Sequence, residues 1–242
     1  MIVLSVGMPR AGSGWHYNLV HDLMQTAGAV PATEIRQRYH LENVLTEVNS
    51  NIGVLSARRL GMVAIPALLG QTFVIKAHAA PTAASRLLQT LGLLKATYIY
   101  RDPRDAMLSA FDYGQRGLQR GRTNAFSHLT TFEHSLNFML GYVHIWEQWI
   151  RQPHVFVTRY EDFQREYQTE VERLLIFLKL DRTASPVREV IEKYRPQEAE
   201  QQKGVHFNKG QMGRFRKIYS TAQQARLAEV LEPYLKRMGY EI

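Results

Sequence analysis

Four short apolar runs, rich in β-branched and aromatic residues, recur along the chain at residues 2–6, 72–75, 96–100 and 155–158. Runs of this length and composition are typical of strands buried on both faces of a sheet. The segments between them carry apolar residues at helical spacing, as Trp15, Leu19 and Leu23 do after the first run. This alternation predicts an α/β fold with a parallel β-sheet flanked by helices. The 242 residues suit one domain, 1–242, around one core.

The first run leads directly into a glycine-rich loop. Residues 7–14 read Gly-Met-Pro-Arg-Ala-Gly-Ser-Gly, and a helical pattern continues from there to a stop at Gly28. Glycine lets the backbone approach a ligand closely, and the unpaired N–H groups at a helix start point at anions. The sequence therefore predicts a phosphate cradle built from strand, loop and helix.

This loop departs from the ATP-binding P-loop. Gly7 and Gly12 have the spacing G-x-x-x-x-G, but Ser13 and Gly14 stand where Lys and Ser/Thr would follow. Arg10 places a cation inside the loop instead, and Trp15 offers an aromatic face that could stack on a base. The sequence predicts a P-loop-like nucleotide site that lacks the ATP-type lysine.

Polar residues follow the later runs, at the carboxyl ends where parallel sheets gather their functional groups. Lys76 and His78 come after the second run and lie two residues apart, on one side of an extended segment. They would bring a cation and a titratable imidazole to the same place. A lone histidine is usually structural or exposed, so the pattern by itself leaves that alternative open.

The third run ends at a predicted helix start, where Asp102 precedes Pro103 as N-cap and first helical residue. Arg101 then ends the strand and Ser109 lies about two turns into the helix, so that both can face one anion. A capped helix with solvated arginines is the alternative. Two further caps are predicted, Asp162 after the fourth run and Thr221 at the last helix, whose apolar face ends before Gly239.

In this order, the motifs resemble those of the cytosolic-type sulfotransferases. The family's loop P-K-S-G-T-T-W is similar to residues 9–15, its K-T-H to 76–78, its R-[D/N]-P-[R/K]-D segment with a following serine to 101–109, its Y-E-D to 160–162 and its F-R-K-G-x-x-G-D-W to 207–215. The last segment departs from the pattern, since Asn208, Arg214 and Phe215 replace Arg, Asp and Trp. An amide can donate to a phosphate but brings no charge.

The resemblance implies an enzyme that uses 3′-phosphoadenosine 5′-phosphosulfate (PAPS), releases 3′,5′-adenosine bisphosphate (PAP) and needs no metal. It implies that His78 is the catalytic base, that Lys76 contacts the transferring group and that Arg10 takes the place of the family's loop lysine. The nucleotide-binding residues implied by the resemblance are Pro9, Arg10, Ala11, Gly12, Ser13, Gly14, Trp15, Arg101, Ser109, Tyr160, Asn208, Lys209 and Gly210.

The amino-acid composition excludes some classes of ligand and site but does not identify one ligand. Thirty Lys and Arg against 22 Asp and Glu give a net charge of +8, which favours an anionic ligand without choosing among nucleotides, sulfated products, nucleic acid and membrane surfaces. The absence of cysteine excludes disulfides and thiolate chemistry and is compatible with a reducing compartment. No apolar run approaches the roughly 20 residues of a membrane span. The first apolar stretch feeds the glycine loop, so we expect no signal peptide and a soluble, cytoplasmic protein.

We therefore expect a sulfotransferase that moves the sulfuryl group of PAPS to an acceptor hydroxyl on a small molecule, glycan or lipid, with no nucleic-acid partner. A P-loop phosphotransferase that uses ATP and a non-catalytic basic scaffold are the alternatives. Residues 32–61 and 114–131 would form the acceptor pocket and lid, or else solvated loops. Residues 217–226 keep only part of the family's dimer motif, so the oligomeric state is left open.

Overall fold

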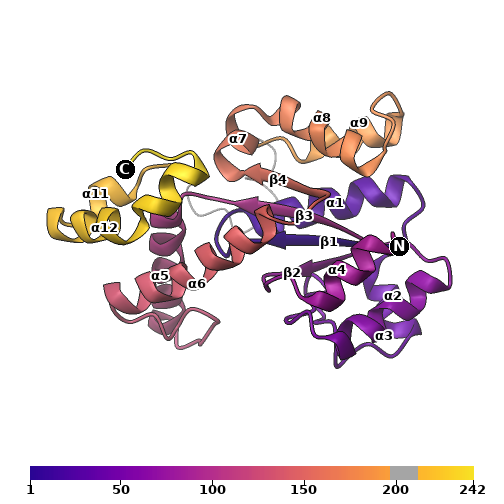
Figure 1. The fold of residues 1–242 in the computed structure, drawn as a ribbon, viewed down its shortest axis with the longest axis horizontal. Coiled ribbons are helices and arrows are strands. Elements are labelled where there is room, and N and C mark those ends of the chain that lie inside the picture. The colour runs from indigo at the N-terminus through magenta and orange to yellow at the C-terminus, as the bar shows by residue number, and fades with distance from the viewer. Residues whose placement is uncertain (197–211) are drawn as a thin grey trace.

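The computed structural model describes residues 1–196 and 212–242 of the chain. In this part of the chain, strands β1 (Ile2–Gly7), β2 (Phe73–Ala77), β3 (Leu94–Tyr100) and β4 (Val155–Arg159) form one sheet in the order β2-β1-β3-β4. All neighbouring strands run parallel, with Leu4 of β1 between Ile75 and Ala96. The predicted parallel sheet and α/β class are confirmed (Figure 1).

Helices occupy the connections between the strands. They are α1 (Ser13–Thr26), α2 (Ala32–Arg38), α3 (Ala57–Leu68), α4 (Ala83–Thr90), α5 (Pro103–Gln119), α6 (Phe132–Ile150), α7 (Tyr160–Arg165), α8 (Tyr167–Leu178), α9 (Ser185–Lys193), α11 (Phe215–Ile218) and α12 (Thr221–Met238). Parallel strands need such crossovers because each strand must start again from the same end of the sheet. Among the described helices, none is long and apolar enough to span a membrane.

Two apolar layers cover the two faces of the sheet. Alternate strand residues point to opposite sides, so Leu4 and Ile75 belong to one layer while Val3 and Val74 belong to the other. Helices α1, α7, α8 and α9 pack on the face of Val3 (Figure 1). Helices α2, α3, α5, α6 and α12 contribute to the layer on the face of Leu4. Burial on both faces explains why the strands read as continuous apolar runs.

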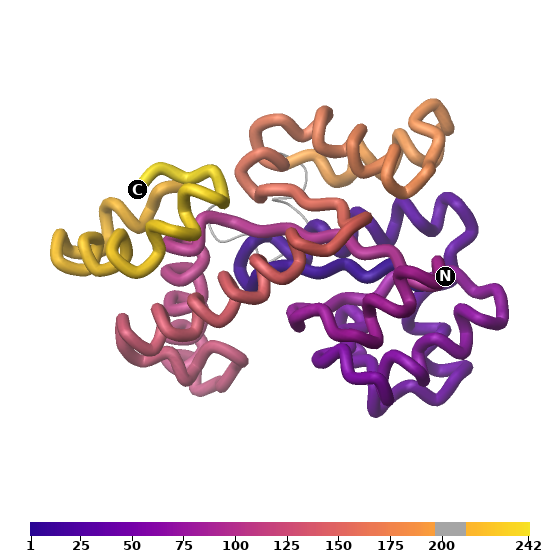
Figure 2. The backbone as a smooth tube through the Cα atoms, in the orientation of Figure 1, coloured from indigo at the N-terminus to yellow at the C-terminus, as the bar shows by residue number. Residues whose placement is uncertain are grey.

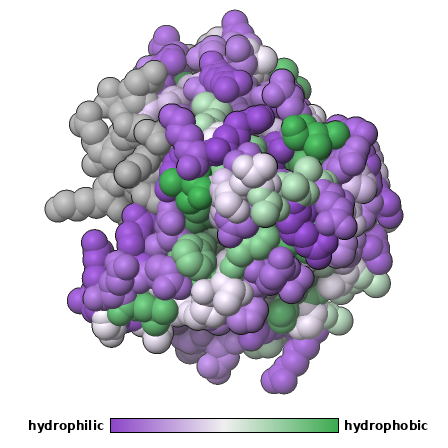
Figure 3. Space-filling model, turned by 90° about the vertical axis from the view of Figure 1, so that its left-hand side faces the viewer, coloured by the Kyte–Doolittle hydropathy of each residue, from purple (hydrophilic) through white to green (hydrophobic). Residues whose placement is uncertain are grey.

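The carboxyl ends of all four strands meet at one edge of the sheet, on the left in Figure 1, near α5. The two chain ends lie toward opposite sides of the molecule (Figure 2). Seen from the side of this carboxyl edge, the surface is largely hydrophilic with scattered apolar patches (Figure 3). The loops that follow the strands therefore converge where functional groups were predicted.

The local predictions fare differently. Asp102 caps α5 by accepting a 2.9 Å hydrogen bond from the Arg104 N–H, with Pro103 as first residue, as predicted. The cap predicted at Asp162 is wrong, because α7 begins at Tyr160 and the Asp162 carboxylate instead binds the Arg159 guanidinium at 2.7 Å. At the last helix the N-cap is Ser220, whose side chain accepts from the Gln223 N–H, so the prediction of Thr221 is wrong by one residue. The helix ends before Gly239, as predicted.

Candidate active site

A cavity of about 460 Å³ lies at the carboxyl edge of the sheet. Its size falls in the usual range for small-molecule sites. Of the predicted site residues that the structure describes, all except Ala11 line it: Pro9, Arg10, Gly12, Ser13, Gly14, Trp15, Lys76, His78, Arg101, Ser109 and Tyr160. Ala11 is fully buried behind the loop. The tertiary structure thus brings together residues that lie up to 151 positions apart, Pro9 and Tyr160.

The glycine loop adopts a left-handed backbone at two positions, Arg10 with φ 64° and Gly12 with φ 73°. At Gly12 a side chain is also excluded by space, since a Cβ there would lie 2.7 Å from the ring of Tyr160. Gly12 is the N-cap of α1 and offers no side-chain hydrogen bond. No side chain therefore caps the start of α1, which is where the sequence predicts an anion.

Trp15 follows the loop and is almost completely buried, with 1% of its surface exposed. Its indole N–H donates to the Tyr194 carbonyl at 3.0 Å, and its ring packs edge-on against Phe163 at 5.2 Å between centroids. Trp15 still contributes to the cavity wall beside Tyr160. Its stacking on a base stays a prediction.

His78 is oriented by the glycine loop itself. Its Nδ1 lies 2.5 Å from the Gly7 carbonyl oxygen. A carbonyl can only accept, so Nδ1 carries the proton and Nε2 is left with a free electron pair. Burial is the main cause that lowers the pKa of His78 to about 4, and the positive charge of Lys76 lowers it further. The hydrogen bond to Gly7 has the opposite, smaller effect. The imidazole is therefore neutral at pH 7 and can act as a base.

Lys76 lies inside β2 rather than after it, since the strand extends to Ala77. The side chain is 7% exposed. Burial lowers the pKa of Lys76 to about 8, and repulsion by Arg10 adds to this effect. Close to neutral pH this ammonium remains mostly charged, and an anion in the cavity would stabilise its charged form further.

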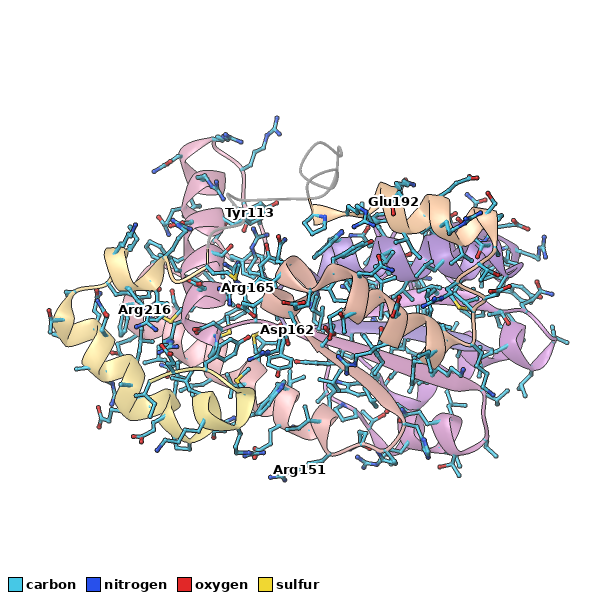
Figure 4. All side chains as sticks on the ribbon, turned by 90° about the horizontal axis from the view of Figure 1, so that it is seen from above. Tyr113, Arg151, Asp162, Arg165, Glu192 and Arg216 are labelled. Atoms are coloured by element: carbon cyan, nitrogen blue, oxygen red, sulfur yellow. The ribbon has the colours of Figure 1, made fainter. Side chains whose placement is uncertain are left out.

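Arg10 reaches from the loop to α5. Its Nε donates to the Ser109 hydroxyl at 3.2 Å, and its guanidinium lies over the ring of Tyr113 at 4.7 Å. Tyr113 occupies the side of α5 that faces the sheet (Figure 4). Burial is the main cause that lowers the pKa of Arg10 to about 10, so the group keeps its charge at pH 7. The cation that the sequence placed in the loop thus bridges to the predicted serine.

A second cationic group lies beside the first helical turn of α5. Arg101 is 7% exposed, and its guanidinium lies 4.8 Å from the centroid of the Tyr160 ring. It also forms ion pairs with Asp105 at 3.7 Å and Glu161 at 4.0 Å. Arg101 and Ser109 both line the cavity, as expected if they face one anion. The cavity therefore holds cations at two places, around Lys76 and around Arg101.

A match to a protein-family model identifies the family of the chain. The model of the sulfotransferase domain family matches residues 2–239, nearly the whole chain. The chain belongs to the sulfotransferase domain family. The predicted family and enzyme class are confirmed, and the alternatives of an ATP-dependent phosphotransferase and a binding scaffold gain no support.

Solved structures show the same fold. A mouse sulfotransferase, SULT7A1, solved in complex with PAP, is 15% identical and has a TM-score of 0.59, with 97% of this chain and 84% of that one covered. A retinol dehydratase solved with androsterone and PAP is 17% identical, with a TM-score of 0.61 and coverage of 97% and 80%. No curated protein sequence matches the chain.

Part of the predicted sulfotransferase site lies outside the described residues, namely Asn208, Lys209 and Gly210. The chain resumes beside the site, where the Asp105 carboxylate accepts from the N–H groups of Gly213 at 2.5 Å and Phe215 at 3.1 Å. Asp105 therefore ties this segment to α5 next to Arg101, a role that no motif indicated.

Eight further residues complete the cavity, and none of them was predicted individually. They are Asn49, Asn51, Tyr113, Asn124, Ala125, Phe126, Phe138 and Tyr142. The first two belong to segment 32–61 and residues 124–126 to segment 114–131, the two segments expected to form the acceptor pocket, whereas Tyr113, Phe138 and Tyr142 lie outside both and were missed. Aromatic residues spaced along α5 and α6 read as ordinary core positions, so the sequence carries no signal that they face a cavity. Within residues 1–196 and 212–242, no group of His, Asp and Glu side chains could hold a metal ion.

Proposed function

We propose that this sulfotransferase transfers the sulfuryl group of PAPS to a hydroxyl of a small molecule with an aromatic or apolar body. One observation carries the proposal: the glycine loop, the Lys76–His78 pair and the Arg101–Ser109 pair open into one cavity. The loop suits the 5′-phosphosulfate, and the second pair suits the 3′-phosphate at the far end of an adenosine. The similar structures that contain PAP support this choice of nucleotide.

In the proposed reaction, Nε2 of His78 takes the proton of the acceptor hydroxyl while the hydroxyl oxygen forms a bond to sulfur. The bond between sulfur and the bridging oxygen breaks, and its electron pair stays on the phosphate of the leaving PAP. Lys76 and Arg10 both line the cavity, and in this reaction their charges would stabilise the sulfuryl and bridging oxygens. His78 is suited to its part because Gly7 fixes its tautomer and burial keeps it neutral.

The walls of the cavity favour an aromatic or apolar acceptor. Phe126 packs edge-on against Tyr113 and Phe138 with centroids 5.8 Å apart in each case, and Phe138 contacts Tyr142 at 4.9 Å. These rings offer an apolar surface on which a flat molecule can stack. Among the described lining residues the charged groups are Arg10, Lys76 and Arg101, with no carboxylate. An acceptor that carries a cationic amine is therefore disfavoured.

Nucleotide titration tests the donor. Calorimetry should show PAP bound at least about 10²-fold more tightly than 5′-AMP, since each charge-assisted contact to the 3′-phosphate contributes on the order of 1.5 to 3 kcal/mol. Binding should persist in EDTA, because Ser13 and Gly14 replace the Walker-type Lys and Ser/Thr that would hold a nucleotide and its magnesium. Equal affinities for the two nucleotides, or binding that requires a metal, would contradict the PAPS assignment.

Turnover with labelled PAPS tests the acceptor. We expect 2-naphthol to be sulfated with a kcat/KM at least about tenfold above that of tyramine, a phenol with a cationic side chain. A preference for tyramine would refute the proposed acceptor class while leaving the donor assignment intact. The cytoplasmic location stays a prediction.

A further inference from the structure

A short stretch of chain runs along the outer edge of β2 beside Lys76. The Lys76 N–H donates to the Ser50 carbonyl at 3.3 Å, and the Ile52 N–H donates to the Lys76 carbonyl at 3.0 Å. These two bonds form a parallel bridge in which Asn51 is the direct partner of Lys76. The sheet thus gains one more pairing at the residue that carries the reactive ammonium.

The backbone of Asn51 is held from its other side by Thr46. The Thr46 N–H donates to the Asn51 carbonyl at 3.0 Å, and the Asn51 N–H donates to the Thr46 hydroxyl at 3.0 Å. The turn between them contains two non-glycine residues with left-handed backbone, Asn49 at φ 58° and Ser50 at φ 44°. Such positions are uncommon for residues other than glycine and concentrate at functional sites. Asn51 is therefore fixed in place at the end of a strained turn.

The Asn51 side chain lies on the same face as that of Lys76, because direct partners in a parallel bridge point to the same side. Asn51, Lys76 and His78 all belong to the residues that line the cavity. The Asn51 Oδ1 accepts from the Gly53 N–H at 2.8 Å. A backbone N–H can bond only to the oxygen of the amide, so the Nδ2 group is the one left to donate.

On the basis of the proposed sulfuryl transfer, we propose that the Asn51 amide is a further catalytic donor, which binds a sulfuryl oxygen beside Lys76 as that oxygen gains negative charge. The chemistry favours this oxygen over the acceptor hydroxyl. The attacking hydroxyl must give its proton to His78 and its electron pair to sulfur, and an N–H bonded to that pair would weaken the attack. Sulfuryl oxygens only accept, and a preorganised neutral donor stabilises them without changing the charge of the site.

Three substitutions at one position test this role. Asn51→Asp keeps the oxygen that the Gly53 N–H needs but removes both donors, and Asn51→Ala removes the donors without adding charge. Asn51→Ser keeps an acceptor for the turn and one hydroxyl donor. We expect kcat with PAPS and 2-naphthol to fall about 10²-fold in the Asp and Ala variants and about tenfold in the Ser variant. PAP affinity should stay within about twofold of the parent in the Ala and Ser variants, because PAP has no sulfuryl group.

The outcomes separate the possible roles. If the Asp variant keeps the parental kcat, Asn51 only holds the turn. If the Ala variant keeps the parental kcat, any loss in the Asp variant comes from its added charge. Either result overturns the proposal. A parallel loss of PAP affinity and melting temperature would also overturn it, since the site would have collapsed. Failure of the proposed function itself is distinct, because the parent chain would then neither bind PAP nor turn over PAPS.

Discussion

The neutral imidazole of His78 gives the most quantitative prediction. Burial and the nearby charge of Lys76 hold the pKa of His78 at about 4 although the bond to Gly7 acts to raise it, whereas an ordinary histidine has a pKa of about 6.5. At pH 5 a base with the lowered pKa is about 90% neutral, and an ordinary histidine is only about 3% neutral. We therefore expect kcat/KM for naphthalene-2-methanol, an acceptor that does not titrate in this range, to fall less than twofold between pH 7 and pH 5. An unperturbed base would lose about 25-fold.

The alkaline side of the same profile reports Lys76. The pKa of its ammonium is lowered to about 8 by burial and by Arg10, and the proposed reaction uses the charged form, so kcat/KM should decline as the pH rises above about 8. The profile should be a bell with its plateau at about pH 5 to 7.

The variant His78→Asn isolates the base. Its amide N–H can still donate to the Gly7 carbonyl, but it has no basic nitrogen, so kcat should fall by about 10² or more while the Kd for PAP changes less than about twofold. Thermal melting controls for folding. Comparable turnover in this variant would remove His78 from the chemistry, and an acid limb near pH 6.5 in the parent chain would refute the argument from burial.

Three other predictions follow from single contacts. Arg10→Ala should lower kcat by about 10² and weaken PAP binding less, with Arg10→Lys milder because a cation is kept; equal kinetics for Arg10→Ala and the parent would contradict the role. Phe138→Ala should raise the KM for 2-naphthol about tenfold, and a change in the Kd for PAP instead would place the ring against the nucleotide. Burial lowers the pKa of His16 to about 3, so the unfolded state binds more protons below about pH 6.5 and stability falls with falling pH. In urea unfolding, the free energy of unfolding should fall between pH 6 and pH 5 by about 1 kcal/mol less in His16→Gln than in the parent chain. An equal fall in both proteins would refute the shifted pKa.

Much of the fold could be predicted because its signals are local. The strands were placed within two residues of their observed ends, and the N-cap at Asp102 was found from its neighbour Pro103. Predictions of single caps failed where two neighbouring residues could both serve, as with Ser220 and Thr221. The Asp162 carboxylate pairs with the guanidinium of Arg159 three residues earlier instead of capping a helix. A search for capping residues does not include such competing ion pairs.

The glycine loop, the Lys76–His78 pair and the Arg101–Ser109 pair could all be found in the sequence, because each is a short motif near the carboxyl end of a strand and parallel strands bring these ends to one edge. The free nitrogen of His78, the size of its pKa shift and the aromatic residues that close the cavity became known only from the folded chain. These properties arise from contacts such as that of His78 with Gly7, or from the bridge that sets Asn51 beside Lys76. A carbonyl acceptor and an amide donor exist in every stretch of chain, and their effect depends on the packing that excludes water around them.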